Sequence, residues 1–258
     1  MIFFVSASIL GAALVYVGGR KTPAGPPITL YGFDGVGVLI GFVIFTLAAV
    51  AIGPIFGMSL LITLLFHELG HVIGYQMIGA GPTRFRLVPL LSDAPISDKP
   101  LRTDGQELLV ALMGPGFCIA PMVLAHIASL MLADSDPAVA ESFQIFAITC
   151  GTVNFIFLLP FWPLDGGHCA RVAAASIWPA FGPAISVFMT SAFAAAAWRT
   201  GSWALLVLAA IGVQSLIRRS AANQPPLDPD TGVIALAAYA FTLAAHFSGG
   251  WQLISLYL

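Results

Sequence analysis

The chain has 258 residues, of which 59% are hydrophobic and only 9% are charged. A soluble domain carries roughly 25% charged residues because its surface faces water, so this composition excludes an ordinary soluble enzyme and predicts an integral membrane protein. The formal net charge of −2 provides no basic surface for nucleic acid, and we expect no nucleic-acid partner.

Long apolar runs follow one another along the chain. A helix needs about 20 apolar residues to cross roughly 30 Å of hydrocarbon. The candidate spans cover residues 2–19, 36–52, 58–79, 107–132, 142–160, 179–198, 203–217 and 232–248. The first run lacks the basic start and the small-residue cleavage site of a signal peptide, so we expect it to be retained. The sequence predicts an all-α polytopic membrane protein with seven or eight transmembrane helices.

The connections between the spans are short. None is long enough for an added PDZ or CBS domain, so we predict one membrane-embedded domain over 1–258, with its motifs in 58–171 and outer helices in 1–52 and 179–258. Between the third and fourth spans, the sequence RFRLVPL alternates enough to suggest a short membrane-associated strand. An unwound substrate could pair with the edge of this strand. The strand positions are Arg84, Phe85, Arg86, Leu87 and Val88.

Basic residues near the span ends predict the orientation in the membrane. With the spans above, eight of the ten Lys and Arg residues fall on one side, and Lys and Arg are enriched on the cytoplasmic side of membrane proteins. The N-terminus is then outside. We expect the cell membrane of a prokaryote as the location.

The third span contains the sequence HELGH, from His67 to His71. Residues four apart lie on one face of a helix, so both imidazoles can bind the same ion. Glu68 can act as general base on a water there, as in the HExxH arrangement of zinc enzymes. Two histidines satisfied by neighbouring groups are the alternative. Three ionisable residues in one membrane turn are costly without a metal, which favours a zinc site. We expect this site towards the cytoplasmic side of the membrane.

A catalytic zinc usually has three protein ligands, so two histidines need a third residue. The segment LLPFWPLDGGH, at 158–168, offers Asp165 after two prolines that end a helix and before two glycines that allow a flexible backbone. A carboxylate on irregular backbone is tolerated at membrane depth where it lines a cavity. The alternative is a turn at the membrane surface with Asp165 solvated, and the segment alone leaves both readings open.

HELGH in one span and PLDGG about a hundred residues later resemble the site-2 protease family of intramembrane metalloproteases. The resemblance includes GAGPTRFRLVPL and QELLVALMGP, and it extends over roughly 58–171. It implies Zn²⁺ held by His67, His71 and Asp165, with Glu68 as the catalytic base. It also implies a membrane-spanning or membrane-anchored protein substrate, whose peptide bond is hydrolysed within the bilayer or at its edge.

Two positions depart from the family pattern. Phe157 stands three residues before the first proline of the loop, where the family usually has an asparagine, and Cys118 stands where an asparagine tends to follow the Gly-Pro. Asn154 and His168 are the candidates to replace the missing amide in oxyanion stabilisation or substrate binding. Structural hydrogen bonding is the other role open to both.

Two further functions remain open. A catalytically inactive, protease-like scaffold that binds membrane segments is supported by Phe157. A metal or ion transporter could use the histidines and Asp165 as an ion pathway, but the chain lacks the paired interrupted helices of two related halves.

The remaining polar and small residues within the spans are expected to have structural roles. We expect His126 and His246 to make interhelical hydrogen bonds and Arg171 to pair with a carboxylate or extend outward. Gly114-Pro115-Gly116 predicts close helix approach or a kink. The three cysteines lack CxxC spacing and are expected to be buried without a disulfide.

Overall fold

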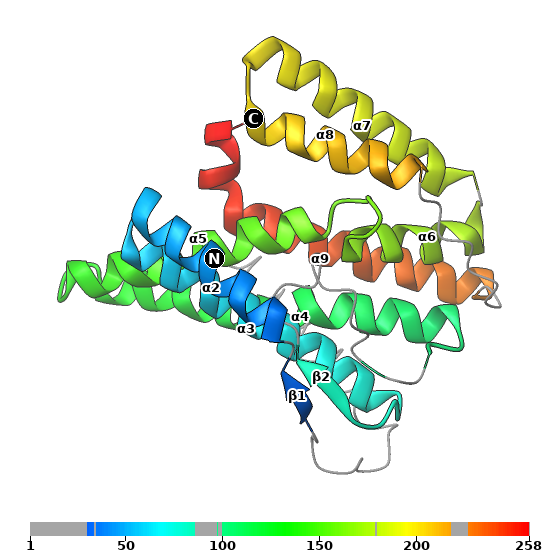
Figure 1. Cartoon of the computed structure of the whole chain (residues 1–258), viewed down its shortest axis with the longest axis horizontal. Helices are drawn as coiled ribbons and strands as arrows, with labels where there is room; N and C mark the ends of the chain where they lie inside the picture. The colour runs from blue at the N-terminus through cyan, green and yellow to red at the C-terminus, as the bar shows by residue number, and fades with distance from the viewer. Residues whose placement is uncertain are drawn as a thin grey trace.

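The computed structural model describes residues 30–33, 35–85, 97, 100–178, 180–217 and 227–257. Within these residues the chain forms eight helices and two short strands (Figure 1). The elements are β1 (Leu30–Phe33), α2 (Gly35–Ala51), α3 (Pro54–Met77), β2 (Thr83–Phe85), α4 (Asp104–Leu132), α5 (Pro137–Phe157), α6 (Asp165–Ile177), α7 (Phe181–Thr200), α8 (Trp203–Ile217) and α9 (Pro229–Tyr257).

Four of the described helices are long and apolar enough to cross a membrane: α3, α4, α5 and the Pro229–Ser255 part of α9. This is fewer than the seven or eight crossings predicted. At 1.5 Å per residue, the 15 residues of α8 reach only about 22 Å, short of a hydrocarbon layer of about 30 Å. The predicted span 2–19 lies outside the described residues. The chain is an all-α integral membrane protein, and the larger number of crossings stays a prediction.

Polar side chains cap the starts of α4 and α5. The Thr103 side chain accepts a hydrogen bond from the backbone N–H of Gln106 at the start of α4, and Asp136 accepts one from Val139 before α5. The predicted membrane spans begin later, at 107 and 142, since a helix can extend beyond its membrane-crossing part to the residue that caps it.

Helix α4 lies at the centre of the fold. It packs against α3, α5, α6 and α9, whereas α7 and α8 pair with each other along one edge of the molecule (Figure 1). The core between α4, α5 and α9 contains Cys118, Met122, Cys150 and Ala245. All three cysteines are buried and free, as predicted.

Glycines bring α3 and α4 into close contact. A Cβ atom added at Gly70 would overlap the carbonyl oxygen of Met113, and one added at Gly114 would overlap the imidazole of His71. The close approach predicted for Gly114-Pro115-Gly116 is therefore confirmed at Gly114, beside one of the candidate metal ligands.

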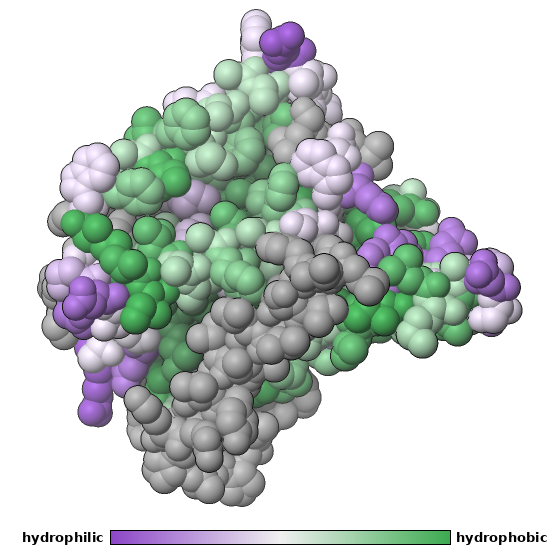
Figure 2. Space-filling model, turned by 180° about the vertical axis from the view of Figure 1, so that it is seen from behind, coloured by the Kyte–Doolittle hydropathy of each residue, from purple (hydrophilic) through white to green (hydrophobic). Residues whose placement is uncertain are grey.

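The outer faces of the helices are apolar. Large side chains such as Val50 and Trp198 are 83% and 92% exposed. Figure 2 shows hydrophobic residues over the central part of one face and hydrophilic residues mainly towards its edges. Apolar faces of this kind are covered by lipid in a membrane protein, so the fold agrees with a lipid bilayer as its environment.

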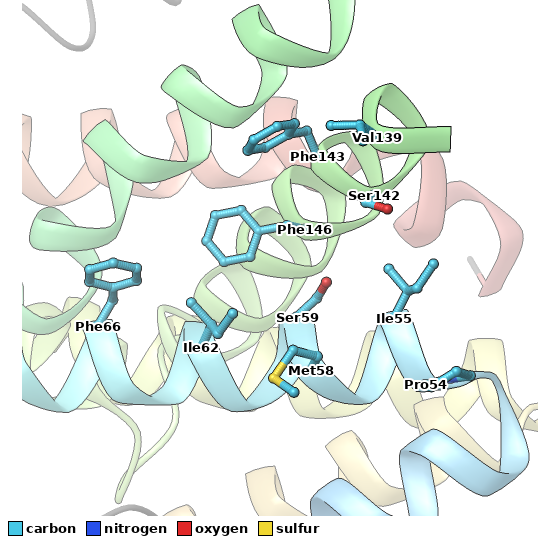
Figure 3. A pocket seen from close by; sticks show the side chains of 10 residues that line it. All are labelled: Pro54, Ile55, Met58, Ser59, Ile62, Phe66, Val139, Ser142, Phe143 and Phe146. Carbon is cyan, nitrogen blue, oxygen red and sulfur yellow. The ribbon is translucent and has the colours of Figure 1, made fainter. Parts of the chain in front are cut away.

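An apolar groove of about 630 Å³ lies between α3 and α5 (Figure 3). Met58, Ile62 and Phe66 line it from α3, and Phe143 and Phe146 line it from α5. Its walls suit hydrocarbon rather than a charged ligand.

The two short strands pair in parallel. Thr83, Arg84 and Phe85 of β2 lie opposite Leu30, Gly32 and Phe33 of β1. The predicted strand overlaps β2 only at Arg84 and Phe85, because Arg86, Leu87 and Val88 lie outside the described residues. The longer strand stays a prediction.

Candidate metal centre

His67 and His71 lie one helical turn apart on α3, and both side chains are buried. Their Nε2 atoms are 3.1 Å apart. Spacing by four residues places both rings on the same face of the helix, as the sequence predicted.

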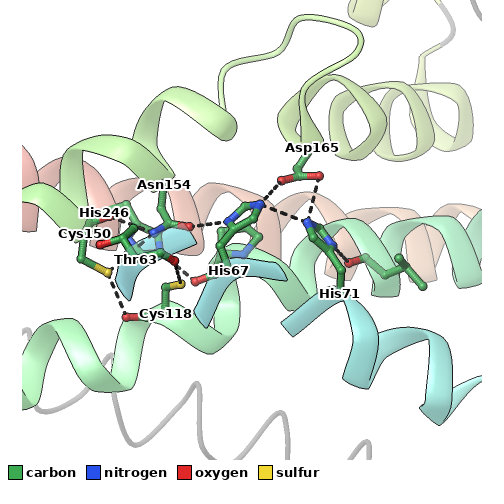
Figure 4. Close-up of polar contacts among 10 residues, drawn as sticks. Thr63, His67, His71, Cys118, Cys150, Asn154, Asp165 and His246 are labelled. Carbon is green, nitrogen blue, oxygen red and sulfur yellow. Dashed lines mark hydrogen bonds and ion pairs between the residues drawn. The ribbon is translucent and has the colours of Figure 1, made fainter. Parts of the chain in front are cut away.

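Asp165 reaches the two histidines from the first residue of α6 (Figure 4). Its Oδ2 atom is 3.1 Å from His67 Nε2, and its Oδ1 atom is 3.4 Å from His71 Nε2. One ligand atom from each residue lies within 4.8 Å of the other two, so the three could hold one metal ion. The carboxylate therefore faces the imidazoles and not a membrane surface, and its side chain is only 17% exposed.

The segment before Asp165 folds tightly over the first turn of α6. Helix α5 ends at Phe157, and a Cβ atom at Gly166 would overlap backbone atoms of Leu158 and Leu159. A Cβ atom at Gly167 would likewise overlap the backbone of Phe161. Neither glycine has positive φ. The two glycines allow backbone to pack closely against backbone. The sequence analysis expected them to make the backbone flexible, and this explanation was wrong.

Hydrogen bonds on the far side of each ring determine which nitrogen faces Asp165. His71 Nδ1 donates to the carbonyl oxygen of Val110 at 2.8 Å, because a carbonyl can only accept. His67 Nδ1 is 2.8 Å from Asn154 Oδ1. The amide nitrogen of Asn154 donates to the Cys150 carbonyl at 2.9 Å, which leaves Oδ1 as the acceptor for His67.

With Nδ1 as the donor, each ring in its neutral form presents an Nε2 lone pair to the same point, beside a carboxylate. Two lone pairs and an anionic oxygen repel one another unless a cation lies between them. Two imidazole nitrogens and one carboxylate oxygen are also a ligand set that catalytic zinc takes, so the residues present fit zinc.

Glu68 is fully buried on the same turn of α3 as His67. Its carboxylate is therefore held inside the protein and is not on a face exposed to lipid.

His168 and Arg171, on α6, contact acidic residues of α4. His168 Nδ1 is 2.8 Å from Glu107 Oε1, and one Arg171 nitrogen is 2.6 Å from Glu107 Oε2 and 3.0 Å from Asp104 Oδ1. The expected pairing of Arg171 with a carboxylate is confirmed. The sequence did not single out Asp104 or Glu107, since acidic residues in the first turn of a helix are common.

Phe157 stacks on the ring of His67, with ring centroids 4.6 Å apart and planes 28° apart. The sequence marked this residue only as a departure from the family pattern, and nothing local indicated the stacking. Cys118, the other departure, is buried with its Sγ atom 3.9 Å from the carbonyl oxygen of Thr63.

The two remaining membrane histidines make interhelical hydrogen bonds, as predicted. His126 on α4 contacts Gln144 of α5 at 3.1 Å. His246 on α9 donates from Nε2 to the Pro115 carbonyl of α4 at 2.8 Å. Among the described residues, neither belongs to a group of three possible metal ligands.

Comparison with known proteins gives a partial match to a curated protein. No protein-family profile matches the chain. The chain is similar to Stage IV sporulation protein FB of Bacillus subtilis (strain 168), with 31% identity over 114 residues. The match covers 43% of this chain and 37% of that protein, so it spans little more than a third of the relative's length.

Proposed function

Because the chain resembles the site-2 protease family, to which Stage IV sporulation protein FB belongs, we propose that it is an intramembrane zinc metalloprotease. The observation that carries the proposal is the convergence of His67, His71 and Asp165, from two helices far apart in sequence, on one point inside a membrane protein. The same convergence supports Zn²⁺ as the cofactor.

Each residue of the site has a distinct part in the proposed reaction. His67, His71 and Asp165 would hold the ion. Zinc in such a site polarises the scissile carbonyl and makes water a stronger nucleophile near neutral pH. Glu68 takes a proton from the attacking water and later delivers it to the leaving amine.

Asn154 and Val110 orient the imidazoles in this proposal. The 2.8 Å contact between Asn154 and His67 favours a positioning role for Asn154 over oxyanion stabilisation. The contact between His168 and Glu107 likewise favours a structural role for His168. Phe157 covers one face of His67, which limits access of water to that side of the ring.

The proposed substrate is a membrane-spanning or membrane-anchored protein, cut near the cytoplasmic side of a prokaryotic cell membrane. The whole chain would act as one membrane-embedded domain with its N-terminus outside. Strand pairing with an unwound substrate at 84–88 is part of the proposal. If it operates, proline at Leu87 should slow cleavage of a membrane substrate, and unchanged cleavage would argue against it.

Zinc content and cleavage together test the proposal. Full-length protein is purified in detergent, and its zinc is measured beside the Asp165→Ala and Glu68→Gln variants. Cleavage is followed with a fluorogenic transmembrane peptide that carries helix-breaking residues. We expect about one zinc per wild-type chain, much less in Asp165→Ala, and retained zinc without cleavage in Glu68→Gln. Equal zinc in wild type and Asp165→Ala would refute the ligand set.

The inactive scaffold is the second candidate, because Phe157 occupies the place of the family's asparagine. A scaffold would bind the transmembrane peptide without cutting it, and Glu68→Gln would then change nothing. A metal or ion transporter would also show no cleavage for Glu68→Gln to abolish.

A further inference from the structure

A cluster of four ionisable side chains connects α4 with α6 beside the metal centre. Asp104 and Glu107 lie in the first turn of α4 and are only 2% and 8% exposed. His168 and Arg171 lie one turn apart on α6. Glu107 contacts both of them, through Oε1 and Oε2, and Asp104 contacts Arg171.

Each carboxylate in this cluster has a basic partner. Burial acts to lower the pKa of Arg171, but hydrogen bonds and charge from Glu107 and Asp104 outweigh it and raise the pKa. Arg171 therefore stays charged. Removing Arg171 would leave the buried Asp104 carboxylate without this basic partner, which is costly in a medium of low dielectric constant.

The cluster lies close to Asp165 along the chain. His168 is three residues after Asp165, so the two belong to the same first turn of α6. That helix has only 13 residues, and irregular backbone precedes it. The contact between His168 and Glu107 fixes the rotation of this turn from the α4 side, and the close packing at Gly166 and Gly167 fixes it from the side of the preceding loop.

The start of α4 also contacts α3, the helix that carries the two histidine ligands. Val110, one turn after Glu107, accepts the hydrogen bond from Nδ1 of His71. The 107–110 turn of α4 thus contacts α3 through His71 and α6 through His168. This part of α4 therefore helps to position both helices that carry the ligands, α3 and α6.

We propose that Glu107 is a positioning residue of the metal centre. It anchors α6 through His168 and Arg171 and so holds the Asp165 carboxylate at the two imidazoles before the ion arrives. The inference rests on the proposed function, because it assumes that these ligands bind zinc. A carboxylate already in place loses less freedom on binding, and the ion binds more tightly.

Zinc affinity separates positioning from a catalytic role of His168. A catalytic helper would change the rate of cleavage at saturating zinc and leave zinc affinity unchanged. A positioning contact changes the affinity itself. The pair His168→Leu and His168→Gln isolates the contact, since the glutamine amide can still donate to Glu107 and leucine cannot.

The experiment uses full-length, metal-free protein in detergent. Its zinc dissociation constant is measured by competition with a chromogenic chelator, and its melting temperature is recorded without metal. The variants are Glu107→Gln, His168→Leu and His168→Gln. Glu141→Gln is the matched control because Glu141 is exposed on α5. We expect Glu107→Gln and His168→Leu to weaken zinc binding by about 10–100-fold. His168→Gln and Glu141→Gln should stay within about threefold of wild type.

Dissociation constants for Glu107→Gln and His168→Leu that equal the wild-type value would overturn the inference. A lower melting temperature with unchanged zinc affinity would also overturn it, because the cluster would then serve stability alone. If Glu107→Gln fails to fold, the comparison of His168→Leu with His168→Gln decides. Failure of the proposed function looks different: wild type and a His67→Ala variant would then bind zinc equally weakly.

Discussion

Replacing Gly70 by alanine places a methyl group between α3 and α4, next to the metal ligands. The added Cβ atom would overlap the carbonyl oxygen of Met113 and lie 2.8 Å from Cα of Gly114. Carbon atoms in favourable contact are about 3.5–4.0 Å apart, so the two helices must separate by about 1 Å. The opposing atoms are backbone and cannot rotate away.

The cost follows from two opposed effects. Overpacking of this kind destabilises a fold by about 1–3 kcal/mol, and the upper end applies because backbone meets backbone. The higher helix propensity of alanine offsets at most about 1 kcal/mol of this destabilisation. The net loss is about 2 kcal/mol, which lowers the melting temperature of a chain of this size by about 4–8 °C.

The same displacement should reach the metal centre. His71 packs against Gly114, and its Nδ1 donates to Val110 on α4. Metal–ligand distances tolerate shifts of only about 0.2 Å. We therefore expect Gly70→Ala to bind zinc more weakly and to cleave a membrane substrate more slowly, as well as to melt earlier.

Gly116→Ala is the matched control, because a Cβ atom there meets nothing within 4 Å. It should melt at or slightly above the wild-type temperature. Unfolding in detergent is often irreversible, so all scans use one heating rate and apparent temperatures are compared. If Gly70→Ala and Gly116→Ala melted at the same temperature, the close contact between α3 and α4 would not exist as described.

Three other perturbations test separate parts of the structure. Asn154→Leu removes the acceptor for His67 Nδ1 and should raise the zinc dissociation constant by about 10–100-fold; an unchanged constant in a competition titration would contradict the positioning role. Treatment with a chelator should abolish cleavage while the far-ultraviolet circular dichroism stays helical, and added zinc should restore activity; activity that survives complete zinc removal would argue against a metalloprotease. At the start of α9, hydrogen bonds from the side chain and backbone of Thr231 lower the pKa of Asp228, so the cap is complete above the ordinary value of 3.8 and is lost as pH falls through the lowered value. An NMR titration of the Asp228 carboxyl checks this, and titration at the ordinary value would count against the cap.

The membrane class and the ligand-bearing motifs could be predicted from the sequence alone. Composition decides whether a surface can face water, and the four-residue spacing of His67 and His71 places both rings on one helix face wherever that helix lies. Asp165 was a candidate because prolines and glycines mark the break that carries it. These are local properties of the chain, so they need no knowledge of which helices are neighbours.

Only the tertiary structure decided which groups surround those ligands. The partners of His67 and His71 are the Asn154 amide and the Val110 carbonyl. Every residue has a backbone carbonyl, so the residue type at position 110 could not identify this partner. The Glu107–His168 contact joins residues 61 apart. Hydrophobic periodicity shows which face of a helix is buried, but the pairing of faces depends on packing between helices, as where Gly70 lets α4 approach α3.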